Sequence, residues 1–244
     1  SDGDGISDAV EGLADSDGDG LLDYLDAIAL PELMVLANSD LLRTLATDTG
    51  LQLLAGRVAA AQQSGGVLIT EAMLLALGLP TDADFAPLGI IADFGVNGLT
   101  TGNRVAQVVL PLPVALPPAA TWRYLGRDGR WYTFAVRGGD ALHSAPSVNG
   151  QCPTTDSPLW QAGLQTGHDC VRLTITDGGA NDVDGIADGI IAETASAPAV
   201  ARRLPDTGGT PTQSQSGGGS ADVLLLVLLM LTLGMRRARR KEWN

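Results

Sequence analysis

The sequence predicts a mainly β protein. We expect a β-sandwich-like domain with short helices, preceded by helix-poor calcium-binding repeats and followed by a linker and one short hydrophobic helix. Three observations support this prediction. Short segments with alternating apolar and polar residues, separated by Gly, Pro and Asn, recur between about residues 85 and 192. Acidic residues crowd into residues 1–26, and an uncharged apolar block lies near the C-terminus.

Charge is distributed very unevenly along the chain, whose net charge is −13. Residues 1–26 carry nine acidic side chains and no Lys or Arg, whereas residues 236–241 hold a basic cluster. An acidic head repels phosphates, so we expect no nucleic acid partner. Carboxylates at this density also repel one another, so a folded acidic head requires a cation.

The acidic segment contains the ligand spacing of a twelve-residue calcium loop over residues 15–26. Carboxylates occupy loop positions 1, 3, 5, 9 and 12, Gly20 lies at the sharp turn, and position 7 offers its backbone carbonyl. Alternate residues of a tight loop point to a common centre, where a hard cation such as Ca²⁺ needs oxygen ligands. The predicted ligands are Asp15, Asp17, Asp19, Leu21, Asp23 and Asp26.

An earlier copy of the repeat lies in phase with this loop. Its predicted ligands are Asp2, Asp4, the Ile6 carbonyl, Asp8 and Glu11. Its first ligand position would precede Ser1, so we expect the chain to be truncated at its N-terminus. A solvated acidic linker is the alternative interpretation of residues 1–26.

The helix-poor tandem spacing resembles thrombospondin type 3 repeats of bacterial surface proteins. The long flanking helices of an EF-hand are absent, and the segment between the copies is too short for the helix that a dockerin repeat needs. The resemblance implies a stiff spacer in which the metal takes the place of a hydrophobic core.

A third acidic stretch, residues 177–188, fits the calcium spacing less well. Asp182, Asp184 and Asp188 match three ligand positions, but Ala180 and Ile191 occupy two others where ligands are expected. The alternative is a turn sequence of Asp, Asn and Gly between two strands.

Residues 27–47 are rich in Leu and Ala, and we expect an apolar connector or a short helix that Pro31 interrupts. Short elements should follow, with Thr70 as the N-cap of the second helix. The expected elements are strands at 51–54 and 67–69 and helices at 57–63 and 70–78.

Alternation then predicts β-strands in the larger part of the chain. Val171, Leu173 and Ile175 should face inward from one strand, and the prolines of residues 111–118 should form an extended connection. The expected strands are residues 104–110, 121–125, 131–136 and 171–175.

The two cysteines, Cys152 and Cys170, are separated by a short loop and suit one disulfide in an oxidising compartment. A pair of free thiols is the alternative.

Several motifs in residues 48–196 resemble the bacterial choice-of-anchor U domain, an extracellular module with variable C-terminal anchors. The resemblance implies an extracellular location and a shared architecture, and it implies no reaction because no catalytic activity is established for that family. Its motifs are Leu110-Pro111-Leu112-Pro113, Trp122-Arg123-Tyr124, Trp131-Tyr132-Thr133-Phe134, the cysteine pair, and the Thr176-Asp177-Gly178-Gly179 to Asp184-Gly185 ending.

No catalytic motif is apparent, and we expect that the protein is not an enzyme. His143 and His168 are the only histidines, and the sequence has no Gly-x-Ser-x-Gly elbow. Trp122, Trp131 and Tyr132 either stack on a sugar or, as their strand spacing favours, belong to the core.

The C-terminal segment resembles a GlyGly-CTERM sorting signal, which rhomboid-type proteases (rhombosortases) cleave. Gly217, Gly218, Gly219 and Ser220 precede a hydrophobic segment at residues 221–235 and the basic cluster. The thirteen residues 223–235 make a helix of only about 20 Å, against about 30 Å of hydrocarbon. The basic tail should stay cytoplasmic until cleavage. The alternative signal is the sortase motif LPDTG at residues 204–208.

Together these features predict an exported structural or adhesive module, displayed on the cell envelope or secreted, whose surface ligand the sequence does not identify. The alternative is an accessory, carbohydrate-binding domain of a secreted hydrolase whose catalytic part precedes Ser1. The expected partners are the membrane before processing and the sorting protease, and Ca²⁺ is the expected cofactor. The predicted organisation is repeats at 1–26, a connector at 27–47, a β domain at 48–196, a linker at 197–216 and a sorting signal at 217–244.

Overall fold

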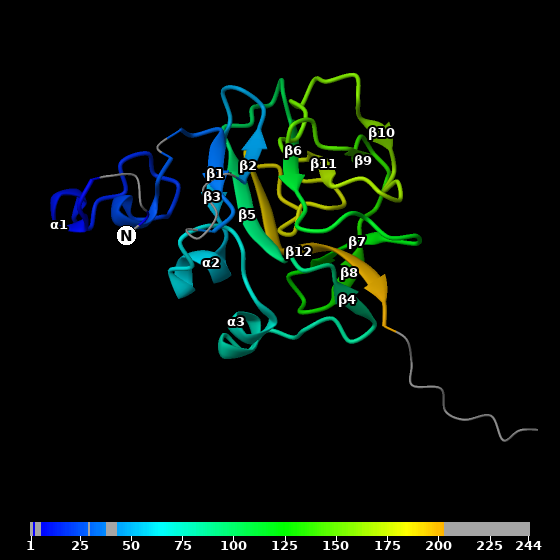
Figure 1. Cartoon of the computed structure of the whole chain (residues 1–244), viewed down its shortest axis with the longest axis horizontal. Coiled ribbons are helices and arrows are strands. Elements are labelled where there is room, and N and C mark those ends of the chain that lie inside the picture. Colours follow the sequence, from blue (N-terminus) through cyan, green and yellow to red (C-terminus); the bar gives the residue numbers. More distant parts are fainter. Residues whose placement is uncertain (1, 3–5, 29, 38–42, 203–244) are drawn as a thin grey trace, which may run out of the picture. The chain divides into compact units, whose positions relative to one another are not determined.

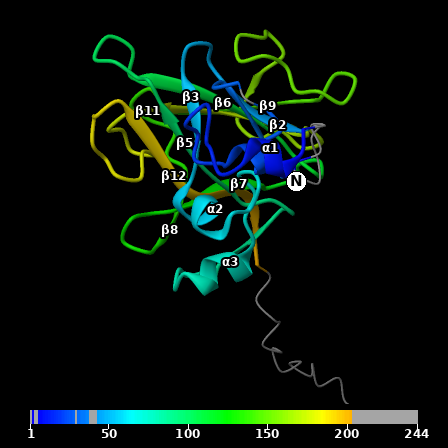
Figure 2. The same cartoon turned by 90° about the vertical axis from the view of Figure 1, so that its left-hand side faces the viewer.

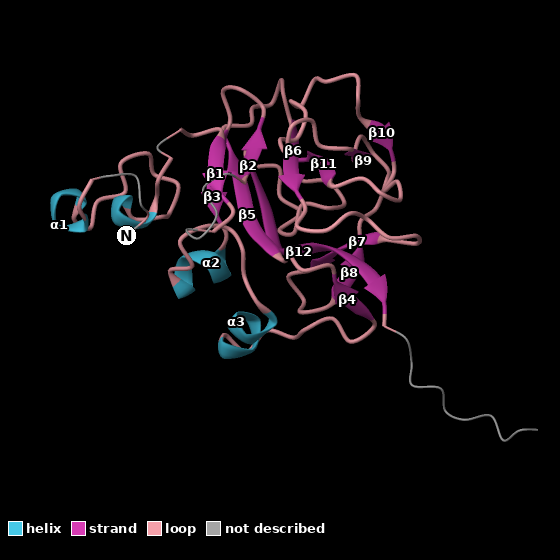
Figure 3. Ribbon diagram, in the orientation of Figure 1, coloured by secondary structure: helices cyan, strands magenta, loops and turns pink. Residues whose placement is uncertain are grey.

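The chain is mainly β, as predicted, with two antiparallel sheets and short helices (Figures 1 and 3). The structure is a computed structural model that describes residues 2, 6–28, 30–37 and 43–202. Its helices are α1 (Asp8–Glu11), α2 (Arg57–Gln62) and α3 (Glu71–Ala76), with a 3₁₀ turn η1 (Asp23–Leu25). Its strands are β1 (Leu33–Val35), β2 (Thr44–Thr47), β3 (Gln52–Ala55), β4 (Phe85–Pro87), β5 (Ala92–Asn97), β6 (Val105–Pro111), β7 (Thr121–Leu125), β8 (Trp131–Thr133), β9 (Ala141–Ala145), β10 (Gln161–Ala162), β11 (Cys170–Thr176) and β12 (Ile190–Ala201).

The two sheets pack face to face as a sandwich around one central core. Sheet A has the strand order β1-β2-β6-β11-β9-β10, and sheet B has the order β3-β5-β12-β7-β8, with β4 also paired to β12. The core between them combines apolar side chains from both sheets. Among them are Leu45, Val108 and Leu173 from sheet A, and Leu53, Phe94 and Trp122 from sheet B.

The strands predicted from alternation form with small shifts at their ends. The expected strand at 121–125 is β7. The strand expected at 104–110 forms one residue later as β6, and the strand expected at 171–175 is β11 with one more residue at each end. Val171, Leu173 and Ile175 face the core with no exposed surface, as predicted. Residues 67–69 form only an isolated bridge, Leu68 to Ala92, and the expected strand at 131–136 ends at Thr133.

The expected apolar connector at 27–47 is wrong from Leu33 onward. Residues 33–35 and 44–47 form β1 and β2, which pair with each other, and β2 also pairs with β6. Met34 and Leu45 point into the central core and have no exposed surface. Burial between the sheets therefore overrides the helix preference of this Leu- and Ala-rich segment.

The expected domain boundary at residue 196 falls inside β12. This strand pairs with β5, then with β7 and β4 after a register shift between Glu193 and Ser196. Because β12 lies in the interior of sheet B, it continues to Ala201 into the segment predicted as a linker. The rest of the linker and the sorting signal lie outside the described residues. Within the described ranges, none of the helices has the length and apolar character that crossing a bilayer demands.

Helices α2 and α3 form a second, smaller core against the outer face of sheet B. Thr70 caps α3, as predicted, because its Oγ1 accepts a hydrogen bond from the Met73 amide at 3.2 Å. The fully buried Asp93 of β5 accepts bonds from the Val58 and Ala59 amides at the start of α2. Burial raises the pKa of this carboxyl group. Asp93 thereby connects α2, which belongs to the second core, to sheet B.

A disulfide joins Cys152 to Cys170, as predicted. Cys170 is buried on the outer face of sheet A beside Val109, Ala145 and Trp160. The bond closes a loop with a sequence separation of 18. It therefore fixes the long connection between β9 and β11 to the sheet.

The Cys152→Ala/Cys170→Ala variant should lose about 3 kcal/mol of unfolding free energy, because the closed loop restricts the unfolded chain. Urea unfolding under oxidising conditions measures the loss. Dithiothreitol should lower the stability of the wild type and leave the variant unchanged. Equal stability of the two proteins without reductant would show that the disulfide does not stabilise the fold.

Candidate metal centre

Asp15 organises the loop that carries the second acidic repeat. Its Oδ1 accepts hydrogen bonds from the amides of Gly18 and Asp19 at 2.8 and 3.2 Å, and its Oδ2 accepts one from Gly20 at 3.1 Å. Gly20 adopts a φ of +92°, which favours glycine at the sharp turn that the repeat requires. The local sequence thus bends the backbone around the Asp15 carboxylate.

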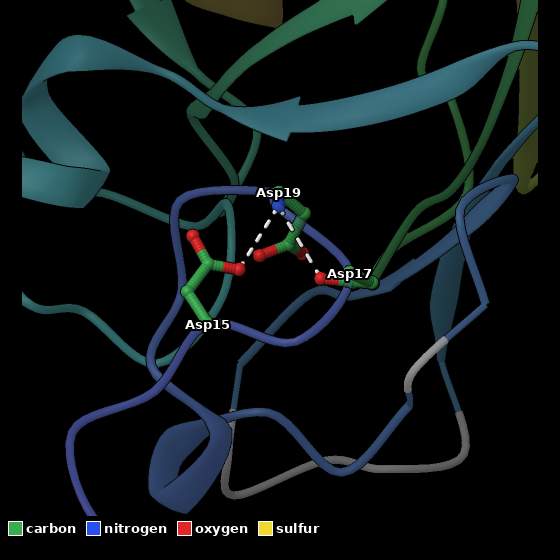
Figure 4. Close-up of side chains that lie close together, drawn as sticks. All are labelled: Asp15, Asp17 and Asp19. Carbon is green, nitrogen blue, oxygen red and sulfur yellow. Dashed lines mark hydrogen bonds between the residues drawn. The ribbon is translucent and has the colours of Figure 1, made fainter.

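The side chains of Asp15, Asp17 and Asp19 converge inside this loop (Figure 4). One carboxylate oxygen from each lies within 4.8 Å of the others, the only such acidic grouping in the part of the chain that is described. Asp19 exposes 2% of its surface. The Oδ2 atoms of Asp17 and Asp19 are buried and have no hydrogen-bond partner among the described residues. Buried carboxylate oxygens of this kind fit a divalent cation.

Burial and mutual repulsion disfavour the ionised form of these carboxylates. Burial, together with the charges of Asp17, Asp26 and Asp15, raises the pKa of Asp19 to about 7, although a hydrogen bond from the Leu21 amide opposes the shift. Burial also raises the pKa of Asp17, with added repulsion from Asp15. A cation held between these groups would remove both penalties.

The remaining predicted ligands of this copy occupy different environments. Asp26 lies close enough to Asp17 for the two charges to interact, and burial raises its pKa to about 6. Asp23 instead accepts bonds from the amide and hydroxyl of Ser16, both at 2.7 Å. Leu21 places its side chain in the central core with 2% exposure. The loop is therefore anchored to the β domain next to the acidic cluster.

The first repeat does not assemble a site of its own among the described residues. Asp2 is buried, and its charge acts on Asp26, so it lies near the second loop. Asp8 and Glu11 lie in the single turn α1, Ile6 is 53% exposed, and Asp4 lies outside the described residues.

The third acidic stretch connects β11 to β12, and its carboxylates bond to backbone amides. Asp182 accepts bonds from Gly178 and Ala192 at 2.7 and 3.1 Å, and burial raises its pKa to about 6. Asp184 and Asp188 each accept a bond from the amide two residues ahead. No three carboxylates of this described stretch converge. The geometry matches the turn alternative.

The aromatic residues considered for sugar stacking do not form a platform. Trp122 is fully buried in the central core, and the Trp131 indole donates to the Pro80 carbonyl at 3.0 Å. Tyr132 is exposed and bonds to Asp128 at 2.7 Å.

The structure contains a serine–histidine pair that the sequence does not predict. Ser144 Oγ lies 3.0 Å from His168 Nδ1. The serine has no exposed surface, and its hydroxyl also bonds to Gly163 and Gln165. A nucleophile must reach its substrate, so this buried pair supports the loop rather than catalysis.

A cavity of about 540 Å³ lies on the outer face of sheet A, beside the disulfide loop. Its lining combines apolar Ala46, Val109 and Pro111 with hydroxyl-bearing Thr44 and Thr154. Sequence analysis missed it because its two walls, residues 43–49 and 150–156, are distant in the chain and meet only in the folded sandwich.

No known protein family, curated protein or solved structure matches the chain.

The Asp19→Asn variant should be more stable than the wild type in chelator at pH 8. Because the pKa of Asp19 is raised in the folded state, its protonation stabilises the fold fully below the ordinary pKa near 4, and this stabilisation is lost as pH rises through about 7. One pKa unit corresponds to about 1.4 kcal/mol, so we expect the variant to gain about 1–3 kcal/mol of unfolding free energy, measured in urea. The gain should shrink at pH 5, and a variant no more stable at pH 8 would contradict the burial of an ionised Asp19.

Proposed function

We propose that the protein is a non-enzymatic, exported bacterial surface module, structural or adhesive, that binds Ca²⁺ at Asp15, Asp17 and Asp19. The convergence of these carboxylates, with two buried oxygens that lack hydrogen-bond partners, is the observation that carries the proposal. Asp26 lies near enough to Asp17 for their charges to interact, outside the group of three carboxylates that converge. Oxygen-only donors favour a hard cation such as Ca²⁺ over zinc or copper, which prefer imidazole and thiolate.

Two further features support the export of the protein. A disulfide persists in oxidising compartments, and calcium is abundant enough outside the cell to fill a weak site. The resemblances to a choice-of-anchor U domain and to a GlyGly-CTERM signal support surface anchoring. In this proposal a rhombosortase-type protease cleaves near residues 217–220, and the tail remains cytoplasmic until cleavage.

Titration calorimetry with CaCl₂ should show binding with a dissociation constant of about 10⁻⁴–10⁻³ M, the range of extracellular modules. The Asp15→Ala/Asp19→Ala variant should lose this binding. The matched control is Asp184→Ala/Asp188→Ala, which removes two carboxylates from the third acidic stretch and should bind normally. Calcium binding that survives in the first variant, or that disappears in the control, would refute this site.

The cavity on sheet A favours a second candidate function, binding of a neutral saccharide. Apolar side chains beside threonine hydroxyls match a sugar ring, which presents C–H groups on one face and hydroxyls at its edge. Arg43 and Asp156 of the same lining are suited to hydrogen-bond such hydroxyls. The wall of residues 150–156 is well fixed. The disulfide holds it, and the Trp160 indole donates to the Thr154 carbonyl at 2.8 Å. This function is compatible with an accessory domain of a secreted hydrolase.

Thr49→Trp should fill the mouth of this cavity and abolish glycan-array binding, a loss of at least about tenfold in affinity. Tyr132→Ala, at the exposed aromatic residue of sheet B, should leave binding intact. A blank array with the folded wild type would dismiss the saccharide function, and loss in the Tyr132 variant alone would move the site to the aromatic residues.

A further inference from the structure

The loop of residues 15–26, called the acidic loop below, covers part of the outer edge of β3. β3 is the edge strand of sheet B, and it pairs with β5 on its inner side alone. On its outer side the Ala55 amide donates to the carbonyl of Asp19 at 2.7 Å, and the Leu53 amide donates to Pro31 at 2.6 Å. In Figure 1 the N-terminal segment lies on the same side of the molecule as β3, and Figure 2 shows it in front of the sheets.

A side chain of β3 adds a second bond to the acidic loop. Gln52 Nε2 donates to the carbonyl of Asp17 at 2.7 Å, and its Oε1 accepts a bond from Asn97 of β5 at 3.4 Å. At Gly20 a side chain would begin 3.6 Å from the Ala55 Cβ, so the turn lies directly against the strand. Leu21 then enters the core that also contains Leu53.

Two residues of the acidic cluster therefore have two roles. Asp17 and Asp19 direct their carboxylates to the cluster, while their backbone carbonyls accept hydrogen bonds from β3. Asp19 exposes only 2% of its surface, and its Oδ2 has no hydrogen-bond partner in the described ranges, which points to a ligand in the loop. A change in the loop backbone must alter both the ligand geometry and the sheet edge.

We propose that Ca²⁺ locks the acidic loop onto β3, so that metal occupancy controls the protection of this sheet edge. The inference rests on the proposed calcium function. Without the cation, repulsion among the clustered carboxylates opposes the compact loop that presents the Asp17 and Asp19 carbonyls. An uncovered edge strand exposes unpaired backbone groups to other chains, so the lock would also protect against edge-to-edge association.

Thermodynamic linkage makes the coupling reciprocal: a ligand that binds the closed loop stabilises it, and contacts that stabilise the closed loop strengthen the binding. At calcium about ten times the dissociation constant, the closed loop should gain about tenfold in population over the open loop. The gain should be greatest at the Ala55 amide of β3, which donates to the Asp19 carbonyl of the loop.

Amide hydrogen exchange of the full chain, with CaCl₂ and with chelator, tests this coupling. Exchange at the Ala55 amide should slow by about tenfold with calcium, whereas Val108 and Leu173, paired within sheet A, should change much less. Calorimetric binding without any slowing at Ala55 would overturn the proposed coupling and leave the calcium function standing. Absence of binding would overturn both.

The Gln52→Ala variant tests the reverse direction, since it removes a bond to the loop and no carboxylate. Loss of one hydrogen bond should weaken calcium binding by about three- to tenfold. Gln165→Ala is the matched control, because its Nε2 also donates to a backbone carbonyl at 2.7 Å, that of Ala162, away from the loop. Equal calcium affinity of the Gln52 variant and the control would contradict the proposal.

Discussion

Carboxylate repulsion at close range is the constraint that shapes the N-terminal part of this protein. Asp15, Asp17 and Asp19 lie within a few ångströms of one another, and Asp19 is almost fully buried. Ionised carboxylates in such a place are unfavourable unless a proton or a cation neutralises them. Hydrogen bonds from loop amides reduce this cost but leave two buried oxygens without partners among the described residues. The proposed Ca²⁺ would supply the neutralising charge.

The same loop is part of the β domain rather than a separate spacer. Leu21 joins the central core, and two carbonyls of the loop bond to β3. A spacer of the thrombospondin type would need no such contacts. We therefore interpret the acidic segment as a component of the sandwich. If so, the proposed metal would stabilise the whole domain.

The sequence predicts well those features that depend on local pattern. Alternation identifies β7 and the inward residues of β11, and three of the carboxylates that the Asp spacing selects converge. It fails where long-range contacts decide the structure. β5 carries Asp93 inside a strand, where its carboxylate accepts bonds from the amides at the start of α2, and no alternation reveals that partner. β12 contains Pro198 and many alanines, so its interior position in sheet B is not apparent from its composition.

A crystal structure of the protein grown with calcium, with anomalous scattering recorded from the cation, would test the central claim most directly. The account predicts an anomalous peak between Asp15, Asp17 and Asp19, about 2.3–2.6 Å from their oxygens, with the loop still bonded to Ala55. A well-ordered loop with no peak, its buried Asp19 carboxyl protonated and hydrogen-bonded, would contradict it.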